Sequence, residues 1–155
     1  MDSVLILFGT QSGNAAMVAE TIKSALERAG VRCELAPENG TEPDLIARQQ
    51  WLLVCCSTHG DGDVPDHMLP LVDAIGRECP DLSSLRYGVI ALGDRTYSDT
   101  FCFGGKRIDS LLRDRGAQRV GERLEVDAST QPFADEVALA WLQGWIEQAR
   151  KSVLA

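Results

Sequence analysis

Hydrophobic and polar positions follow two distinct patterns along this chain. Short runs of consecutive apolar residues are typical of strands buried on both faces of a parallel sheet. Such runs predict strands at residues 3–8, 51–56 and 87–92. Residues 31–36 alternate between apolar and polar side chains, which predicts an edge strand, and residues 123–127 predict a fifth strand.

Between these strands, apolar residues recur every three or four positions, as on one face of a helix. The first such segment, residues 14–29, is followed by Gly30, a common C-terminal stop. In the last segment Pro132 marks a helix start, and the spacing directs Trp141 and Trp145 toward the core. Helices are predicted at residues 14–29, 43–50, 65–75, 106–115 and 132–150, and a long loop at residues 93–105.

Alternation of strands and helices predicts a parallel sheet, because each connection has to cross a face of the sheet. Right-handed crossovers then place helices on both faces. The chain has 155 residues, without an internal repeat or a linker, which suits one hydrophobic core. We therefore predict an α/β three-layer sandwich with a five-stranded parallel sheet, formed by a single domain over residues 1–155.

Composition and cysteine content narrow the class of protein. No apolar stretch is long enough to span a bilayer, and the acidic N-terminus does not resemble a secretory signal, so we expect a cytoplasmic protein without membrane contact. The five cysteines are odd in number and include no C-x-x-C pair, which argues against a disulfide framework or a metal site. Cys55 and Cys56 are expected to pack as small hydrophobic residues.

The formal net charge of −8 argues against binding to nucleic acid, because phosphates have to be neutralised by Lys and Arg. An acidic surface steers encounters with a basic protein partner. Solubility alone also explains the charge, and both interpretations stay open at this point.

Three unusual loops follow the first, third and fourth predicted strands. The carboxyl ends of parallel strands meet at one edge of a sheet, where ligands of such folds bind. The first loop, "GTQSGNA", leads into a helix whose N-terminal N–H groups suit a phosphate, with Thr10 and Ser12 as hydroxyl donors. It lacks the Walker lysine and the G-x-G-x-x-G pattern, and no Lys or Arg occurs before Lys23. The competing interpretation is a helix capped by Ser12 or Asn14.

The other two loops contain polar and aromatic candidates. "CSTHGDGDVP" follows the third strand, and "LGDRTYSDTFC" places one tyrosine in an otherwise polar loop, where it offers a stacking surface. A solvated His59 and a solvated turn at Asp94 and Arg95 are the competing interpretations. Together the three loops suit a ligand with a phosphate, a polar tail and a flat ring.

The motifs "GTQSGNA", "STHGDGDVPD", "ALGDRTYSDTFC" and "GAQR" resemble the flavodoxin family, in particular its short-chain members of the MioC type. They also resemble the FMN domains of diflavin reductases. The likeness covers nearly the whole chain, with four motifs in the family's order. It implies a flavodoxin-like fold with sheet order 2-1-3-4-5 and non-covalently bound FMN.

By this resemblance, FMN contacts come from each of the three loops. The phosphate would be held by Thr10, Gln11, Ser12, Gly13, Asn14 and Ala15. The flavin ring would lie between Ser57, Thr58, His59 and Gly60 on one face and Leu92, Gly93, Asp94, Arg95, Thr96 and Tyr97 on the other. Phe101 and Cys102 would close the third loop, and Asp127 would be an acidic residue near the flavin. The resemblance also implies that the peptide at Gly60 turns with the redox state of the flavin.

Two positions depart from the family's pattern. Many flavodoxins carry a hydroxyl residue where Ala15 stands, although diflavin domains share the alanine. Many carry Trp or Tyr where His59 stands, and a histidine there would couple the flavin potential to pH.

The resemblance implies a low-potential one-electron carrier and not an enzyme. Its donor would be an NADPH-dependent flavoprotein reductase with a basic face, its acceptor a redox enzyme, and the protein itself a monomer. The alternative is an FMN-dependent NAD(P)H quinone or azo reductase, which usually needs an oligomer for its nicotinamide site. A response-regulator receiver and a low-molecular-weight phosphatase are excluded, because the acidic pair and the cysteine–arginine spacing that they require are missing.

Overall fold

The sheet has the predicted parallel order, with its fifth position divided between two strands. The computed structural model describes residues 1–10, 12–59 and 62–154, without the side chains of residues 97–99 and 154. The strands are β1 (Ser3–Gly9), β2 (Arg32–Leu35), β3 (Trp51–Cys56), β4 (Arg86–Gly93), β5 (Gln118–Arg119) and β6 (Leu124–Asp127). They are parallel in the order β2-β1-β3-β4-β5, and β6 also pairs with β4. The order 2-1-3-4-5 is confirmed.

The division of the fifth position was not predicted. Strand β5 pairs with the start of β4, where Gln118 lies opposite Arg86, and β6 pairs with its end, where Asp127 lies opposite Gly93. Between them the chain leaves the sheet through Gly121, which has a φ of 73°. Two polar residues form no apolar run, so β5 gave no periodic signal.

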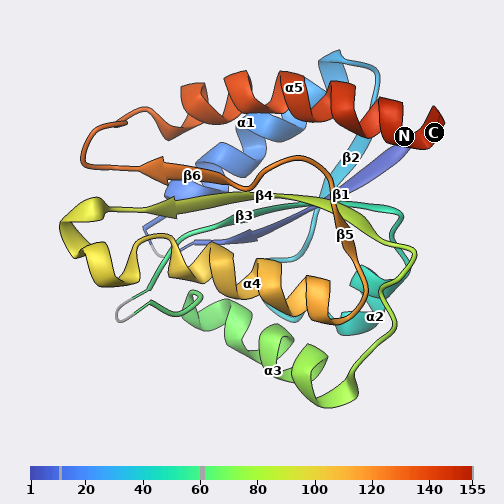
Figure 1. Cartoon of the computed structure of the whole chain (residues 1–155), viewed down its shortest axis with the longest axis horizontal. Helices are drawn as coiled ribbons and strands as arrows, with labels where there is room; N and C mark the ends of the chain where they lie inside the picture. Colours follow the sequence, from blue (N-terminus) through green and yellow to red (C-terminus); the bar gives the residue numbers. More distant parts are fainter. Residues whose placement is uncertain (11, 60–61, 155) are drawn as a thin grey trace.

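Two layers of helices cover the sheet (Figure 1). Helices α1 (Asn14–Arg28) and α5 (Ala134–Leu154) lie on one face, and α2 (Pro43–Ala47), α3 (Leu69–Glu78) and α4 (Phe103–Asp114) lie on the other. Successive residues of β1 alternate between the two cores: Leu5 and Leu7 pack with α3 and α4, whereas Val4 and Ile6 pack with α1 and α5. Burial on both faces explains the continuous apolar run, because strand side chains alternate between faces.

Several helix bounds differ from the prediction. A 3₁₀ turn, η1 (Asp66–Met68), precedes α3, which continues to Glu78. A second, η2 (Arg95–Thr100), lies within the predicted long loop, and α4 begins at Phe103 instead of residue 106. The first turn of α4 contains Gly104 and Gly105, whose lack of side chains hid the helical pattern. Among the described helices, none is both long enough and apolar enough to cross a membrane.

Candidate functional site

Strands β1, β3, β4 and β6 end at one edge of the sheet, at the left of Figure 1, and a hollow of about 570 Å³ opens there. This size is typical of a small-molecule site. The predicted site residues that line it are Ser12, Asn14, Ser57, Thr58, Leu92, Gly93 and Asp94. Residues from all three of the loops singled out in the sequence therefore meet at one hollow.

The first loop presents the N-terminus of α1. Gly13, rather than Ser12 or Asn14, occupies the N-cap position with a φ of 90°, and no side chain among the described residues caps the helix. The first helical hydrogen bond runs from Met17 N to Gly13 O, at 3.0 Å. The amides that precede it, from Asn14 to Ala16, therefore have no partner within the helix. These amides and the positive end of the helix dipole suit an anion.

Two neighbouring residues set the shape of this loop. The Gly13 amide donates to Thr10 Oγ1 at 2.8 Å. Ala15 is fully buried with the core of α1 and α5, so that its amide, and not its side chain, is available at the helix N-terminus. Gln11 lies outside the described residues, and its predicted phosphate contact stays a prediction.

The second loop is tied to β1, β4 and α4. Ser57 N donates to Gly9 O at 2.8 Å. Thr58 Oγ1 donates to Leu92 O at 3.1 Å and accepts from Gly104 N at 3.2 Å. The backbone that lines the hollow is therefore fixed by three separate elements.

His59 begins a narrow turn. Its backbone pairs with that of Asp63 in both directions, at 2.8 and 3.0 Å, and Gly62 in the turn has a φ of 105°. The imidazole Nε2 lies 3.7 Å from Asp66 Oδ1, and His59 does not line the hollow. Gly60 lies outside the described residues. The flavin contacts of both stay predictions.

Asp63 stabilises the end of this turn. Its carboxylate accepts from Val64 N at 2.7 Å and forms an ion pair with Arg107 of α4. The hydrogen bond from the Val64 backbone N–H lowers the pKa of Asp63 most, and the interaction with Arg107 lowers it further. The carboxylate is therefore charged at neutral pH. The ion pair thereby anchors the turn to α4, while backbone bonds close the turn itself.

The third loop forms η2, with Asp94 as its N-cap: the Asp94 carboxylate accepts from Thr96 N at 2.8 Å. The Arg95 guanidinium lies over the Phe101 ring, with 4.1 Å between its carbon and the ring centroid. Phe101 and Cys102 are buried and lie outside the lining of the hollow, so they support the loop from beneath. Thr96 is exposed, and the Tyr97 side chain is outside the described part; their flavin contacts stay predictions.

Asp127, at the end of β6, joins the third loop to the segment that follows β6. Its buried carboxylate accepts from Arg95 N at 3.0 Å and from Ser129 N and Oγ at 3.0 and 2.7 Å. The Arg95 amide and the Ser129 hydroxyl lower the pKa of Asp127, which keeps it ionised. Asp127 does not line the hollow, and its proximity to a flavin stays a prediction.

One wall of the hollow was not predicted from the sequence. The additional lining residues are Met17, Thr100, Val126, Ala128, Gln131, Pro132 and Ala134. Most of them belong to the end of β6 and the segment after it. The signal was available, because the loop after the fifth strand lies at the same carboxyl edge as the other three.

The lining of the hollow is nearly neutral. Among the described residues that line it, Asp94 is the only charged one. A bound phosphate would therefore depend on amide hydrogens, hydroxyls and the dipole of α1, as the absence of Lys and Arg before Lys23 predicts.

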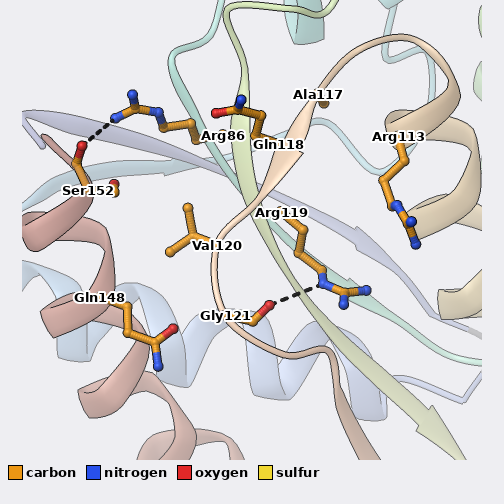
Figure 2. Close-up of a pocket in the computed structure, with 9 residues that line it drawn as sticks. All are labelled: Arg86, Arg113, Ala117, Gln118, Arg119, Val120, Gly121, Gln148 and Ser152. Atoms are coloured by element: carbon orange, nitrogen blue, oxygen red, sulfur yellow. Dashed lines mark hydrogen bonds between the residues drawn. The ribbon is translucent and has the colours of Figure 1, made fainter. Parts of the chain in front are cut away.

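A second hollow, of about 790 Å³, lies at the amino end of β4, where the fifth position of the sheet divides (Figure 2). Arg86, Arg113 and Arg119 line it. Two of them are bound to the protein itself, as the dashed lines in Figure 2 show: Arg86 Nη1 donates to Ser152 O at 3.4 Å, and Arg119 Nε donates to Gly121 O at 3.1 Å. These two arginines hold the end of α5 and the break in the fifth strand.

Arg119 also belongs to a buried charge network. Its Nη1 pairs with the fully buried Asp109, whose carboxylate also accepts from Arg123 Nη1 and from the Tyr87 hydroxyl, both at 2.6 Å. Burial and the Asp109 carboxylate raise the pKa of Tyr87. The network joins α4, β4 and the divided fifth strand, and its role is structural.

Comparisons with known proteins agree with this geometry. Residues 6–141 match the family described as Flavodoxin. The chain is 39% identical over 145 residues to Flavodoxin YqcA of Escherichia coli (94% of this chain, 97% of that protein) and 36% identical over 146 residues to Protein MioC of Escherichia coli (94% and 97%). It is 36% identical over 142 residues to the sulfite reductase [NADPH] flavoprotein alpha-component of Bacillus subtilis, covering 91% of this chain and 23% of that protein. Among solved structures, a mutant flavodoxin from Pseudomonas aeruginosa superposes with a TM-score of 0.85 at 33% identity, covering 94% of this chain and 97% of the other. The chain therefore belongs to the flavodoxin family.

Proposed function

We propose that this flavodoxin binds FMN non-covalently in the 570 Å³ hollow and carries electrons one at a time between two redox proteins. The observation that carries the proposal is the open N-terminus of α1, capped by Gly13 in a left-handed conformation, beside a hollow lined by Ser57, Thr58 and Gly93. The amides of α1 fit a phosphate, and the rest of the hollow fits a polar chain and a flat ring. Bound FMN supplies the one-electron chemistry, which the protein tunes.

The charges around the hollow favour a low potential. Asp94 lines it, and Asp63 and Asp127, both with lowered pKa values, hold the loops beside it in their ionised forms. A second negative charge at roughly 4 Å costs about 4 kcal/mol at an effective dielectric near 20. Negative charge added to the cofactor on reduction is therefore disfavoured, which separates the two reduction steps.

The proposed donor is an NADPH-dependent flavoprotein reductase, and the acceptor is a redox enzyme. The similarity to part of a sulfite reductase [NADPH] flavoprotein subunit supports this kind of donor. A net charge of −8 suits a partner with a basic face. Met17 lines the hollow and is 45% exposed, and it offers an apolar contact at the same edge. We propose that the protein acts as a monomer.

The proposal is tested by recording absorption spectra of the purified protein with added FMN during stepwise reduction. We expect a yellow complex that is reduced in two resolved one-electron steps and oxidises NADPH slowly when no reductase is present. A protein that takes up no FMN would end the proposal. Rapid NADPH oxidation by the isolated protein would instead support the quinone or azo reductase.

A further inference from the structure

His67 connects three segments that are distant in the sequence, behind the loop between β1 and α1. Its Nε2 lies 2.9 Å from Thr10 N, and its Nδ1 lies 2.7 Å from Glu38 O. The histidine itself belongs to η1, which precedes α3. One side chain therefore holds the start of the loop beside α1 against the connection between β2 and α2.

The two partners determine the protonation of the ring. The carbonyl of Glu38 only accepts hydrogen bonds, so Nδ1 carries a proton and donates it. The amide of Thr10 only donates, so Nε2 is unprotonated and accepts. Both bonds together require the neutral imidazole in a single tautomer.

The bond to Thr10 continues to the N-terminus of α1. Thr10 Oγ1 accepts from Gly13 N at 2.8 Å, and Gly13 O accepts from Met17 N at 3.0 Å. The amides that face an anion follow Gly13 directly. A shift of Thr10 is thus transmitted through one side chain to the residue that caps the helix.

We propose that His67 is a positioning residue for the phosphate of the ligand: its neutral imidazole fixes Thr10 and thereby aims the N-terminal amides of α1. The inference rests on the proposed FMN site. A protonated Nε2 would be a hydrogen-bond donor facing the Thr10 amide, which is also a donor, and the bond between them would be lost. Acid is therefore expected to weaken binding of the phosphate. Histidine is the side chain that changes charge between about pH 5 and about pH 8.

The charged groups around the ring are acidic. Glu38 is the only charged residue, among those described, that lines the small cavity beside the imidazole, and Asp66 precedes His67 in the chain. A bound phosphate adds negative charge on the side of Thr10, and its own second ionisation falls at about pH 6. A test by pH therefore needs a variant that keeps the hydrogen bonds and does not titrate.

His67→Gln provides that variant, because an amide offers one acceptor and one donor, as a neutral imidazole does. His67→Leu removes both. Dissociation constants for FMN and for riboflavin, which has the same ring without the phosphate, are measured by quenching of flavin fluorescence at about pH 8 and about pH 5. Hydrogen exchange at the Thr10 amide of the flavin-free chain gives a readout that does not depend on binding.

At about pH 8 we expect His67→Leu to bind FMN about tenfold more weakly, with unchanged affinity for riboflavin and lost protection at Thr10. His67→Gln is expected to retain FMN affinity and to lose less of it in acid than the wild type. The inference would be overturned if His67→Leu weakened the binding of FMN and riboflavin equally. It would also be overturned if His67→Gln lost as much FMN affinity in acid as the wild type, because that loss would then belong to His59 or to the phosphate. A wild type that binds riboflavin no worse than FMN would overturn it as well, and one that binds neither would overturn the proposed function itself.

Discussion

Gly104 is the residue whose enlargement most directly tests the packing of the site. It is the second residue of α4, is buried, and donates its amide to Thr58 Oγ1. A Cβ at this position would overlap the carbonyl oxygen of Ser57 and lie 3.1 Å from the carbonyl oxygen of Asp63. Both are backbone atoms of the loop after β3, so Gly104→Ala has to move the loop that lines the hollow.

The expected magnitude follows from two opposing effects. Overpacking of this kind costs roughly 1–3 kcal/mol, and the better helix propensity of alanine returns up to about 1 kcal/mol. Because the overlapped atoms are backbone, the cost lies in the upper part of this range, and the net loss is about 1–2 kcal/mol. It corresponds to an FMN affinity about fivefold to thirtyfold lower, if the displaced loop has to return on binding. Urea denaturation of the flavin-free protein measures the first quantity, and fluorescence titration with FMN measures the second.

Gly144→Ala is the matched control. Gly144 lies within α5, where an added Cβ would meet no atom within 4 Å apart from its chain neighbours and the backbone of its own helix, and it is remote in sequence from the loops of the site. The same substitution is expected to stabilise the protein there by about 0.5–1 kcal/mol without changing FMN affinity. If Gly104→Ala behaved like Gly144→Ala in both assays, the inferred contact between α4 and the site loop would be refuted.

Three further predictions concern stability and thiol chemistry. Asp109→Ala is expected to lower the free energy of unfolding by about 2–3 kcal/mol in urea denaturation, because it removes the buried carboxylate that pairs with the half-buried Arg119 and Arg123 and accepts from the Tyr87 hydroxyl; a loss below about 1 kcal/mol would contradict this. Iodoacetamide is expected to modify the exposed Cys79 in the native protein and to spare Cys56, since burial raises the pKa of Cys56 to about 12; mass spectrometry of the labelled peptides identifies the site. Asp127→Asn is expected to reduce the loss of thermal stability between about pH 7 and about pH 3. The Arg95 amide lowers the pKa of Asp127, so its contribution to stability is complete above the unfolded pKa of about 3.9 and disappears as the pH falls through the folded value; equal acid losses in variant and wild type would exclude this role.

The layered architecture was readable from local patterns. Continuous apolar runs such as β3, buried at every residue, report a strand covered on both faces, and the apolar stripe of α1 reports one buried helix face. The parallel arrangement follows from their alternation, and with it the convergence of three loops at one edge. The strand order and the identity of the ligand came instead from the resemblance of four motifs to the flavodoxin family.

Positions that depend on close approach between distant segments were not readable. Gly104 and Gly105 conceal the start of α4, because a glycine pair is typical of a loop. Only the structure shows that the Ser57 carbonyl and Ala91 occupy the space of a side chain at these positions. The two polar residues of β5 join the sheet only because β4 offers them a free edge.

Local periodicity was enough to locate the longer strands and most of each helix, and to bring three loops to the carboxyl edge, because a segment that is buried along its length repeats its apolar residues at the spacing of its secondary structure. Packing of the elements against one another was needed to place His67 beside a backbone amide 57 residues away and to let Asp127 join the loops after β4 and β6. Such bonds depend on the relative placement of elements to within a few tenths of an ångström, and no local pattern of apolar and polar residues encodes that distance.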